Sequence, residues 1–157
     1  SGGTLVCGDA DAFSSDLAGN DTSATQARIL GIEPTGSADA DRLILKVNLW
    51  DLEPGTTLPL FSMKAWDETT SPGMARAVRV VDKDAEVLGT YPDGSPAIVR
   101  HQLGKGTVIA FAANPFAPLV TVEKSSWPKL IKALQKSLGC KVERPIWRFA
   151  LPPPGRI

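Results

Sequence analysis

The sequence has few of the residues on which protein chemistry most often depends. Its 157 residues include two cysteines, one histidine and one tyrosine. Two cysteines are too few for a disulfide framework, and a single histidine argues against a zinc cluster. We therefore expect no metal site and no cofactor.

An excess of charge of either sign is also missing. Lysine plus arginine and aspartate plus glutamate number 17 each, so the formal net charge is zero. This balance provides no electrostatic footprint for nucleic acid or an anionic membrane surface. No apolar run approaches the roughly 20 residues that span a bilayer, and the first residues contain no basic and apolar leader. We expect neither nucleic acid nor membrane as a partner. The sequence does not fix the compartment: an upstream signal would make it extracellular or periplasmic, and the cytoplasm stays an alternative.

The most informative stretch is 85–116, which predicts three strands joined by two tight turns. Asp93-Gly94 supplies the first reversal and Gly104-Lys105-Gly106 the second, because glycine reaches positive φ without a Cβ clash. The third strand, Thr107 to Ala113, is apolar on both faces. That pattern indicates a strand at the centre of a larger sheet.

The start of the chain predicts a short buried strand, Thr4 to Cys7, followed by a polar loop, 8–22. We expect this loop to cross the carboxyl end of the strand, where open α/β sheets place their ligands. Ser23 and Gln26 match a capping box, which predicts a short helix, Ala24 to Leu30, ended by Gly31. A second helix is predicted after Ser126 by apolar residues at helical spacing, with lysines facing water; its apolar positions are Trp127, Leu130, Ile131, Leu134 and Leu138, and its lysines are Lys129, Lys132 and Lys136.

The middle of the chain, 38–81, is interpreted as a β-rich insertion. A polar connector, Thr35 to Asp41, leads to a predicted strand, Arg42 to Trp50, whose second half alternates apolar and polar residues. Pro59 places the next extended segment, Leu58 to Trp66, at a sheet edge. A further strand is expected over Ala75–Val81, and a last strand or an extended tail over Pro145–Leu151. Together these elements predict one α/β domain over 1–157, with a mostly parallel sheet, an antiparallel meander and packed helices.

Three features together resemble a known family: the glycine pair before a short strand in GGTLVCGD, the segment YPDGSPA at Tyr91 to Ala97 followed by Gly104 to Gly106, and the closing helix ending in Leu-Gly. The chain is similar to the glutamine-amidotransferase-like domain, including the variety called the β-galactosidase trimerisation domain, found in multidomain carbohydrate-active proteins. The resemblance implies a flavodoxin-like sandwich whose first strands and helices precede Gly2. The chain would then be a C-terminal portion of a longer protein, or the missing part would come from another chain.

The resemblance also implies a function. Catalytic amidotransferases of this family carry a cysteine in a glycine-flanked elbow, with a histidine and a glutamate downstream; the trimerisation-type relatives have lost this set, and the chain resembles them. The expected function is a non-catalytic accessory or oligomerisation module of a larger, carbohydrate-related bacterial protein. Its expected partners are other domains of the same polypeptide or further copies of the chain, and carbohydrate is a possible ligand.

Two alternatives remain open. In the first, Cys7 is the nucleophile of a thiol hydrolase or amidotransferase-like enzyme, with His101 as base. We favour a structural Cys7, because Leu5 replaces the glycine expected two residues before the nucleophile and His101 does not match the family's catalytic histidine. In the second, a small molecule or sugar binds at the carboxyl ends of Thr4–Cys7 and Thr107–Ala113; the proposed ligand-binding residues are Asp9, Asp11, Asn114 and Phe116.

Overall fold

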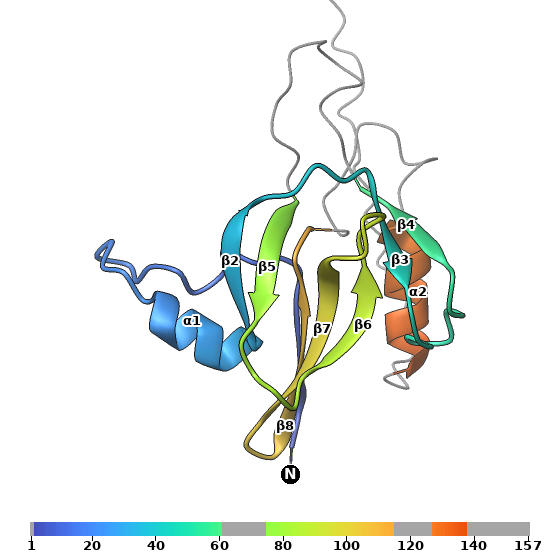
Figure 1. Ribbon diagram of the computed structural model, residues 1–157. Helices are drawn as coiled ribbons and strands as arrows, with labels where there is room; N and C mark the ends of the chain where they lie inside the picture. The colour runs from blue at the N-terminus through green and yellow to red at the C-terminus, as the bar shows by residue number, and fades with distance from the viewer. Residues whose placement is uncertain (1, 61–74, 115–126, 138–157) are drawn as a thin grey trace, which may run out of the picture.

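The computed structural model describes residues 2–60, 75–114 and 127–137 (Figure 1). The described part contains a six-stranded sheet, a two-stranded ribbon and two helices. The strands are β1 Thr4–Cys7, β2 Ile32–Ser37, β3 Arg42–Leu45, β4 Thr57–Pro59, β5 Arg76–Val80, β6 Glu86–Thr90, β7 Pro96–Leu103 and β8 Gly106–Phe111, and the helices are α1 Ser23–Leu30 and α2 Trp127–Ser137.

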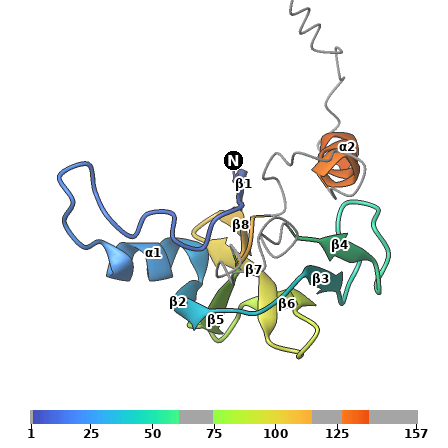
Figure 2. The ribbon, with the colours of Figure 1, turned by 90° about the horizontal axis from the view of Figure 1, so that it is seen from above.

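The large sheet has the order β1-β8-β7-β6-β3-β4, and the ribbon pairs β2 with β5. Seen from above, the sheet curls, with α1 and the ribbon beside β7 and β8 and with α2 near β4 (Figure 2). The mixed α/β class is confirmed. The expectation of a mostly parallel sheet is wrong: β1 and β8 are parallel, whereas the other four strand pairs of this sheet are antiparallel. The physical reason is that tight turns can join only antiparallel neighbours.

The predicted meander is confirmed as β6, β7 and β8. Leu103 pairs with Gly106 across a two-residue loop in which Gly104 has a φ of 60°. At the other turn, Gly94 has a φ of 88°, and the Tyr91 N–H donates to the Ser95 carbonyl at 3.0 Å. As expected, β8 lies inside the sheet, between β1 and β7.

Strand β1 has its expected bounds but not its expected burial. It forms an edge of the six-stranded sheet, and Leu5 is 40% exposed. The Thr107 N–H donates to the Gly3 carbonyl at 2.9 Å on the inner side of β1. Within the described ranges no strand pairs with its outer side. The expectation of a buried strand is therefore wrong, because apolar composition alone does not tell an inner strand from an edge.

Helix α1 is confirmed, but its predicted capping box is wrong. The N-cap is Thr22, which makes no side-chain cap hydrogen bond, so Ser23 already belongs to the helix. Gln26 is buried and donates from Nε2 to the Ala10 carbonyl instead of reaching back to the helix start. Gly31 ends the helix as predicted, with a φ of 69° and its N–H bonded to the Ala27 carbonyl at 2.9 Å.

The middle of the chain departs from prediction in two places. The polar connector expected to start at Thr35 is partly a strand, because β2 pairs antiparallel with β5 through a bulge at Pro34–Gly36. The strand expected from Arg42 to Trp50 already ends at Leu45. Trp50 and Asp51 have φ values of 49° and 69°, which no strand accommodates.

Other predictions for the middle and the carboxyl-terminal part agree where they can be followed. Pro59 lies in β4, at the sheet edge, as expected. Strand β5 matches the expected strand at 75–81. Segments 61–66 and 145–151 lie outside the described residues.

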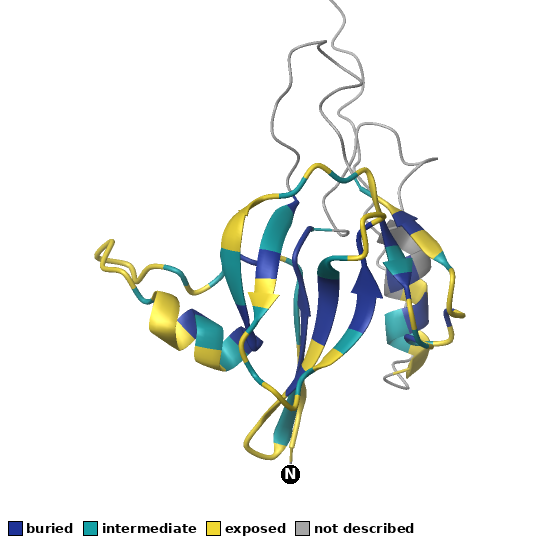
Figure 3. Cartoon of the chain, viewed as in Figure 1, coloured by how far each residue is buried: buried dark blue, intermediate teal, exposed yellow. Residues whose placement is uncertain are grey.

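The core lies where β6, β7 and β8 cross the centre of the sheet (Figure 3). Its largest fully buried side chains include Tyr91, Phe111, Leu88 and Ile98. Helix α2 contributes the buried Leu130, and its Lys132 and Lys136 are exposed, as its predicted pattern requires. No helix among the described residues is long and apolar enough to cross a membrane.

Candidate functional site

The residues predicted to bind a ligand lie at the carboxyl ends of two strands of the large sheet, β1 and β8. Cys7 ends β1, and Asn114 follows the end of β8. Because β1 and β8 are parallel neighbours, the chain leaves both strands at the same end of the sheet. The structure therefore brings the Asp9–Asp11 segment and the segment before Asn114 to one end of the sheet, while Phe116 lies outside the described residues.

The Asp9–Asp11 segment has a defined conformation. The Cys7 Sγ donates to the Asp9 carbonyl at 3.2 Å, and Oδ1 of Asp9 accepts the N–H of Asp11 at 2.9 Å. Ala10 is buried between the two aspartates, and its carbonyl accepts the hydrogen bond from Gln26 of α1. Both acidic side chains are thus attached to a loop that α1 holds in place.

Arg76 also lies at this end of the sheet, and the sequence analysis did not identify it. Its Nε and Nη2 donate to Oδ2 of Asp11 at 2.7 and 2.6 Å. Its backbone N–H donates to the Ala112 carbonyl at 2.8 Å, and its carbonyl accepts the Tyr91 hydroxyl at 2.9 Å. Arg76 therefore connects the acidic loop, the end of β8 and the meander. No local pattern could have found it, because Asp11 and Arg76 are 65 residues apart in the sequence.

Tyr91 has a structural part in this arrangement. Its ring is buried, and burial raises the pKa of Tyr91 well above the usual range of tyrosine. The hydroxyl therefore stays protonated and donates to the Arg76 carbonyl. Tyr91 begins the segment on which the family resemblance most depends, so part of that motif holds β5 against the meander.

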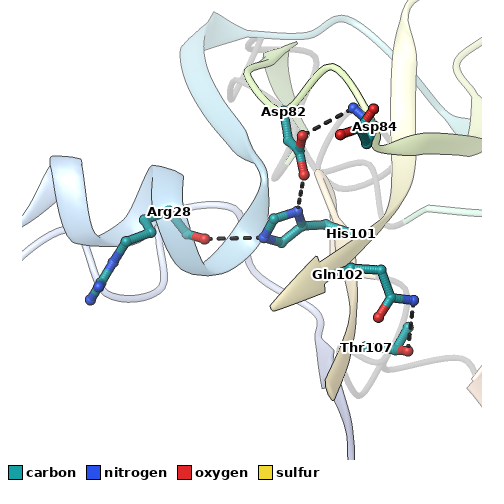
Figure 4. A network of polar contacts seen from close by, with 6 residues as sticks. All are labelled: Arg28, Asp82, Asp84, His101, Gln102 and Thr107. Carbon is teal, nitrogen blue, oxygen red and sulfur yellow. Dashed lines mark hydrogen bonds and ion pairs between the residues drawn. The ribbon is translucent and has the colours of Figure 1, made fainter. Parts of the chain in front are cut away.

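Cys7 and His101, the alternative catalytic pair, each have other partners. His101 lies in β7 and is 8% exposed. Its Nδ1 lies 2.6 Å from Oδ2 of Asp82, and its Nε2 lies 3.1 Å from the Arg28 carbonyl (Figure 4). The Cys7 thiol is half-buried and bonds to the Asp9 carbonyl. Both ring nitrogens of His101 are therefore occupied by groups other than the thiol.

The acidic loop does not assemble a metal centre within the described ranges. There, no group of three or more histidine, cysteine, aspartate and glutamate side chains could hold an ion. Asp16 serves its own loop instead: hydrogen bonds from the side chain and the backbone of Asn20 lower the pKa of Asp16.

Comparison with known proteins relates this fold to part of larger enzymes. No protein-family model matches the chain, and no curated protein matches it. Among solved structures, Gan42B, a GH42 β-galactosidase from G. stearothermophilus, is similar with a TM-score of 0.58 and 18% identity, over 89% of this chain and 18% of that chain. A β-galactosidase from Rahnella sp. R3 has a TM-score of 0.55 and 14% identity, over 88% of this chain and 19% of that one. One from Bacillus circulans sp. alkalophilus has a TM-score of 0.50 and 17% identity, over 74% of this chain and 15% of that one.

These similarities describe the fold. The chain spans less than a fifth of the length of each of the three β-galactosidases. In this chain, the described residues form a strand-rich fold, a curled six-stranded sheet with few helices.

Proposed function

We propose that the chain is a non-catalytic accessory or oligomerisation module of a larger, carbohydrate-related protein. In this proposal it is a glutamine-amidotransferase-like domain of the β-galactosidase trimerisation type, and its full fold is flavodoxin-like. One observation carries the proposal: nearly nine tenths of the chain is similar in fold to less than a fifth of a GH42 β-galactosidase. The motif resemblance at Tyr91–Ala97 supports the same family independently.

The open edge of β1 supports an assembly role. The Thr107 N–H bonds to the Gly3 carbonyl, and alternate residues of a parallel strand bond to the same neighbour. Thr4 and Val6 therefore direct their backbone N–H and carbonyl groups away from β8. An added strand would pair with these groups, and this is a common way in which a sheet edge binds a partner.

An apolar hollow beside the same edge supports this role further. It has a volume of about 300 Å³, and its side-chain lining includes Leu5, Leu103 and Val108. Leu5 and Leu103 are 40% and 39% exposed. A partner strand on β1 could place an apolar side chain in this hollow and remove both leucines from water. We propose that the strand comes from another domain of the polypeptide or from a second copy of the chain.

Light scattering of the 157-residue chain tests the assembly role. We expect a mass above that of the monomer, increasing with concentration. The substitution Leu5→Lys should return the mass to the monomer value, because it places a charge beside the edge. Leu17→Lys is the matched control, since Leu17 is fully exposed in the 8–22 loop. A wild-type monomer at every concentration would contradict self-assembly through β1.

A sugar-binding site is the second candidate function, and the fixed position of Asp11 favours it. Arg76 holds the Asp11 carboxylate, and Gln26 holds the loop that carries it. A preorganised polar group binds a ligand without the entropic cost of ordering a loop. Calorimetric titration with mono- and disaccharides tests this candidate, with Asp11→Asn as the variant. The absence of heat with every sugar would rule it out.

The catalytic alternative has less support. A thiol hydrolase needs a base that takes the proton of the thiol, at about 2.6–3.2 Å from the sulfur or through one water molecule. Both nitrogens of His101 bond elsewhere, to Asp82 and to the Arg28 carbonyl.

A further inference from the structure

His101 lies between two groups that only accept hydrogen bonds. One is the carboxylate of Asp82, in the turn between β5 and β6, and the other is the backbone carbonyl of Arg28 in α1 (Figure 4). A neutral imidazole carries one N–H, whereas the protonated ring carries two. Hydrogen bonds from both ring nitrogens therefore need the imidazolium.

The ring lies between an acidic side chain and the carboxyl end of a helix. Hydrogen bonding from the Asp84 N–H and then the contact with His101 lower the pKa of Asp82, so this neighbour is a carboxylate. Lys83 also acts on Asp82 electrostatically from the same turn. On the other side, the ring meets the last turn of α1, and a helix carries partial negative charge at its carboxyl end. The Arg28 side chain points away from the ring (Figure 4).

The end of α1 fits closely against His101. The last carbonyls of a helix lack intrahelical partners, and the ring supplies one for Arg28. Gly31 directly follows the last residue of α1, and a Cβ built on Gly31 would lie 2.8 Å from both Cβ and Cγ of His101. The ring is therefore in direct contact with the helix end.

We propose that His101 is a proton-dependent latch that fastens α1 to the sheet. The protonated ring donates to Asp82 and to the Arg28 carbonyl at the same time. When the ring gives one proton to solvent, one of these acceptors faces a lone pair and its hydrogen bond is lost. Because Asp82 is charged and the Arg28 carbonyl is not, the remaining N–H stays with Asp82 and the bond to α1 is the one released.

The latch acts on the candidate site through α1. Gln26 of this helix holds the Ala10 carbonyl, and Ala10 lies between Asp9 and Asp11. Loss of the bond to Arg28 therefore weakens the attachment of α1 and, through Gln26, the hold on the acidic loop. This last step rests on the role proposed for that loop in sugar binding, whereas the latch itself does not.

NMR on the full chain tests the latch. Histidines ordinarily titrate near pH 6.5, so we compare about pH 5.5 with about pH 8.5. At the lower pH, the ring ¹⁵N shifts should show that both nitrogens carry protons. At the higher pH, amide exchange of α1, corrected for its intrinsic pH dependence, should accelerate by about 10- to 100-fold, which corresponds to the loss of one hydrogen bond to a charged group. Protection of α1 that does not change with pH would overturn the proposal.

Asp82→Asn and Asp93→Asn form a matched pair of variants. Each aspartate accepts the N–H of the residue two positions on, at 3.0 Å for Asp82 and 2.9 Å for Asp93, but only Asp82 contacts His101. Asp82→Asn should remove most of the pH dependence of α1 exchange, and Asp93→Asn should leave it unchanged. Equal effects of the two variants would show a merely structural role. Exchange is measured without sugar at a single low protein concentration, so failure of the assembly or sugar-binding proposal does not affect this result.

Discussion

Gly31→Ala perturbs the contact between α1 and His101 in a way whose magnitude follows from the structure. Gly31 has a φ of 69°, a conformation that costs a residue with a Cβ about 1–2 kcal/mol. The new methyl would also lie 2.8 Å from Cβ and Cγ of His101. Relief of such overpacking costs about 1–3 kcal/mol. We therefore expect Gly31→Ala to lower the free energy of unfolding by about 2–5 kcal/mol.

Gly94→Ala is the control that separates the two contributions. Gly94 has a φ of 88°, but a Cβ there would meet no atom within 4 Å. Gly94→Ala should therefore lower the free energy of unfolding by the backbone contribution alone, about 1–2 kcal/mol. Urea unfolding, followed by circular dichroism, measures both variants against the wild type. Equal losses for the two variants would refute the proposed contact between the helix end and His101.

Three further predictions concern the core, the thiol and the acid limit of stability. Phe111→Ala should lower the free energy of unfolding by about 3–5 kcal/mol in urea unfolding, because Phe111 is fully buried in β8. The rate of Cys7 alkylation should be no lower in His101→Gln than in wild type, and a marked decrease would favour the thiol-hydrolase alternative. Hydrogen bonds from the hydroxyl and then the backbone N–H of Ser95 lower the pKa of Asp93 from 3.8. The stability that Asp93 contributes should thus be complete above pH 3.8 and decrease as the pH falls through its folded pKa; urea unfolding at several acidic pH values should show a smaller decrease for Asp93→Asn.

The meander could be predicted because its determinants are local. Each turn needs glycine at a position of positive φ, and both Gly94 and Gly104 have one. The apolar run of β8 indicates coverage on both faces, and the buried Val108 and Phe111 agree. The end of α1 at Gly31 follows from the same kind of local chemistry.

Features that depend on distant residues could not be predicted. Gln26 matches a capping box in sequence, yet it serves the Ala10 carbonyl, because a buried carbonyl needs a donor. Arg76 becomes part of the candidate site only because β5 begins beside the end of β8. The sequence pattern also predicted β1 inside the sheet, because a short apolar strand of four residues has the same pattern at an edge and at the centre.

Amide hydrogen exchange at Thr4 and Val6 tests the assembly role most directly. These two N–H groups face the open edge of β1, so they should exchange fast in dilute monomer. The account predicts that their exchange slows as the protein concentration rises and the mass in solution increases, because a partner strand then accepts their hydrogen bonds. Fast exchange at both positions in a sample whose mass is above that of the monomer would contradict assembly through β1.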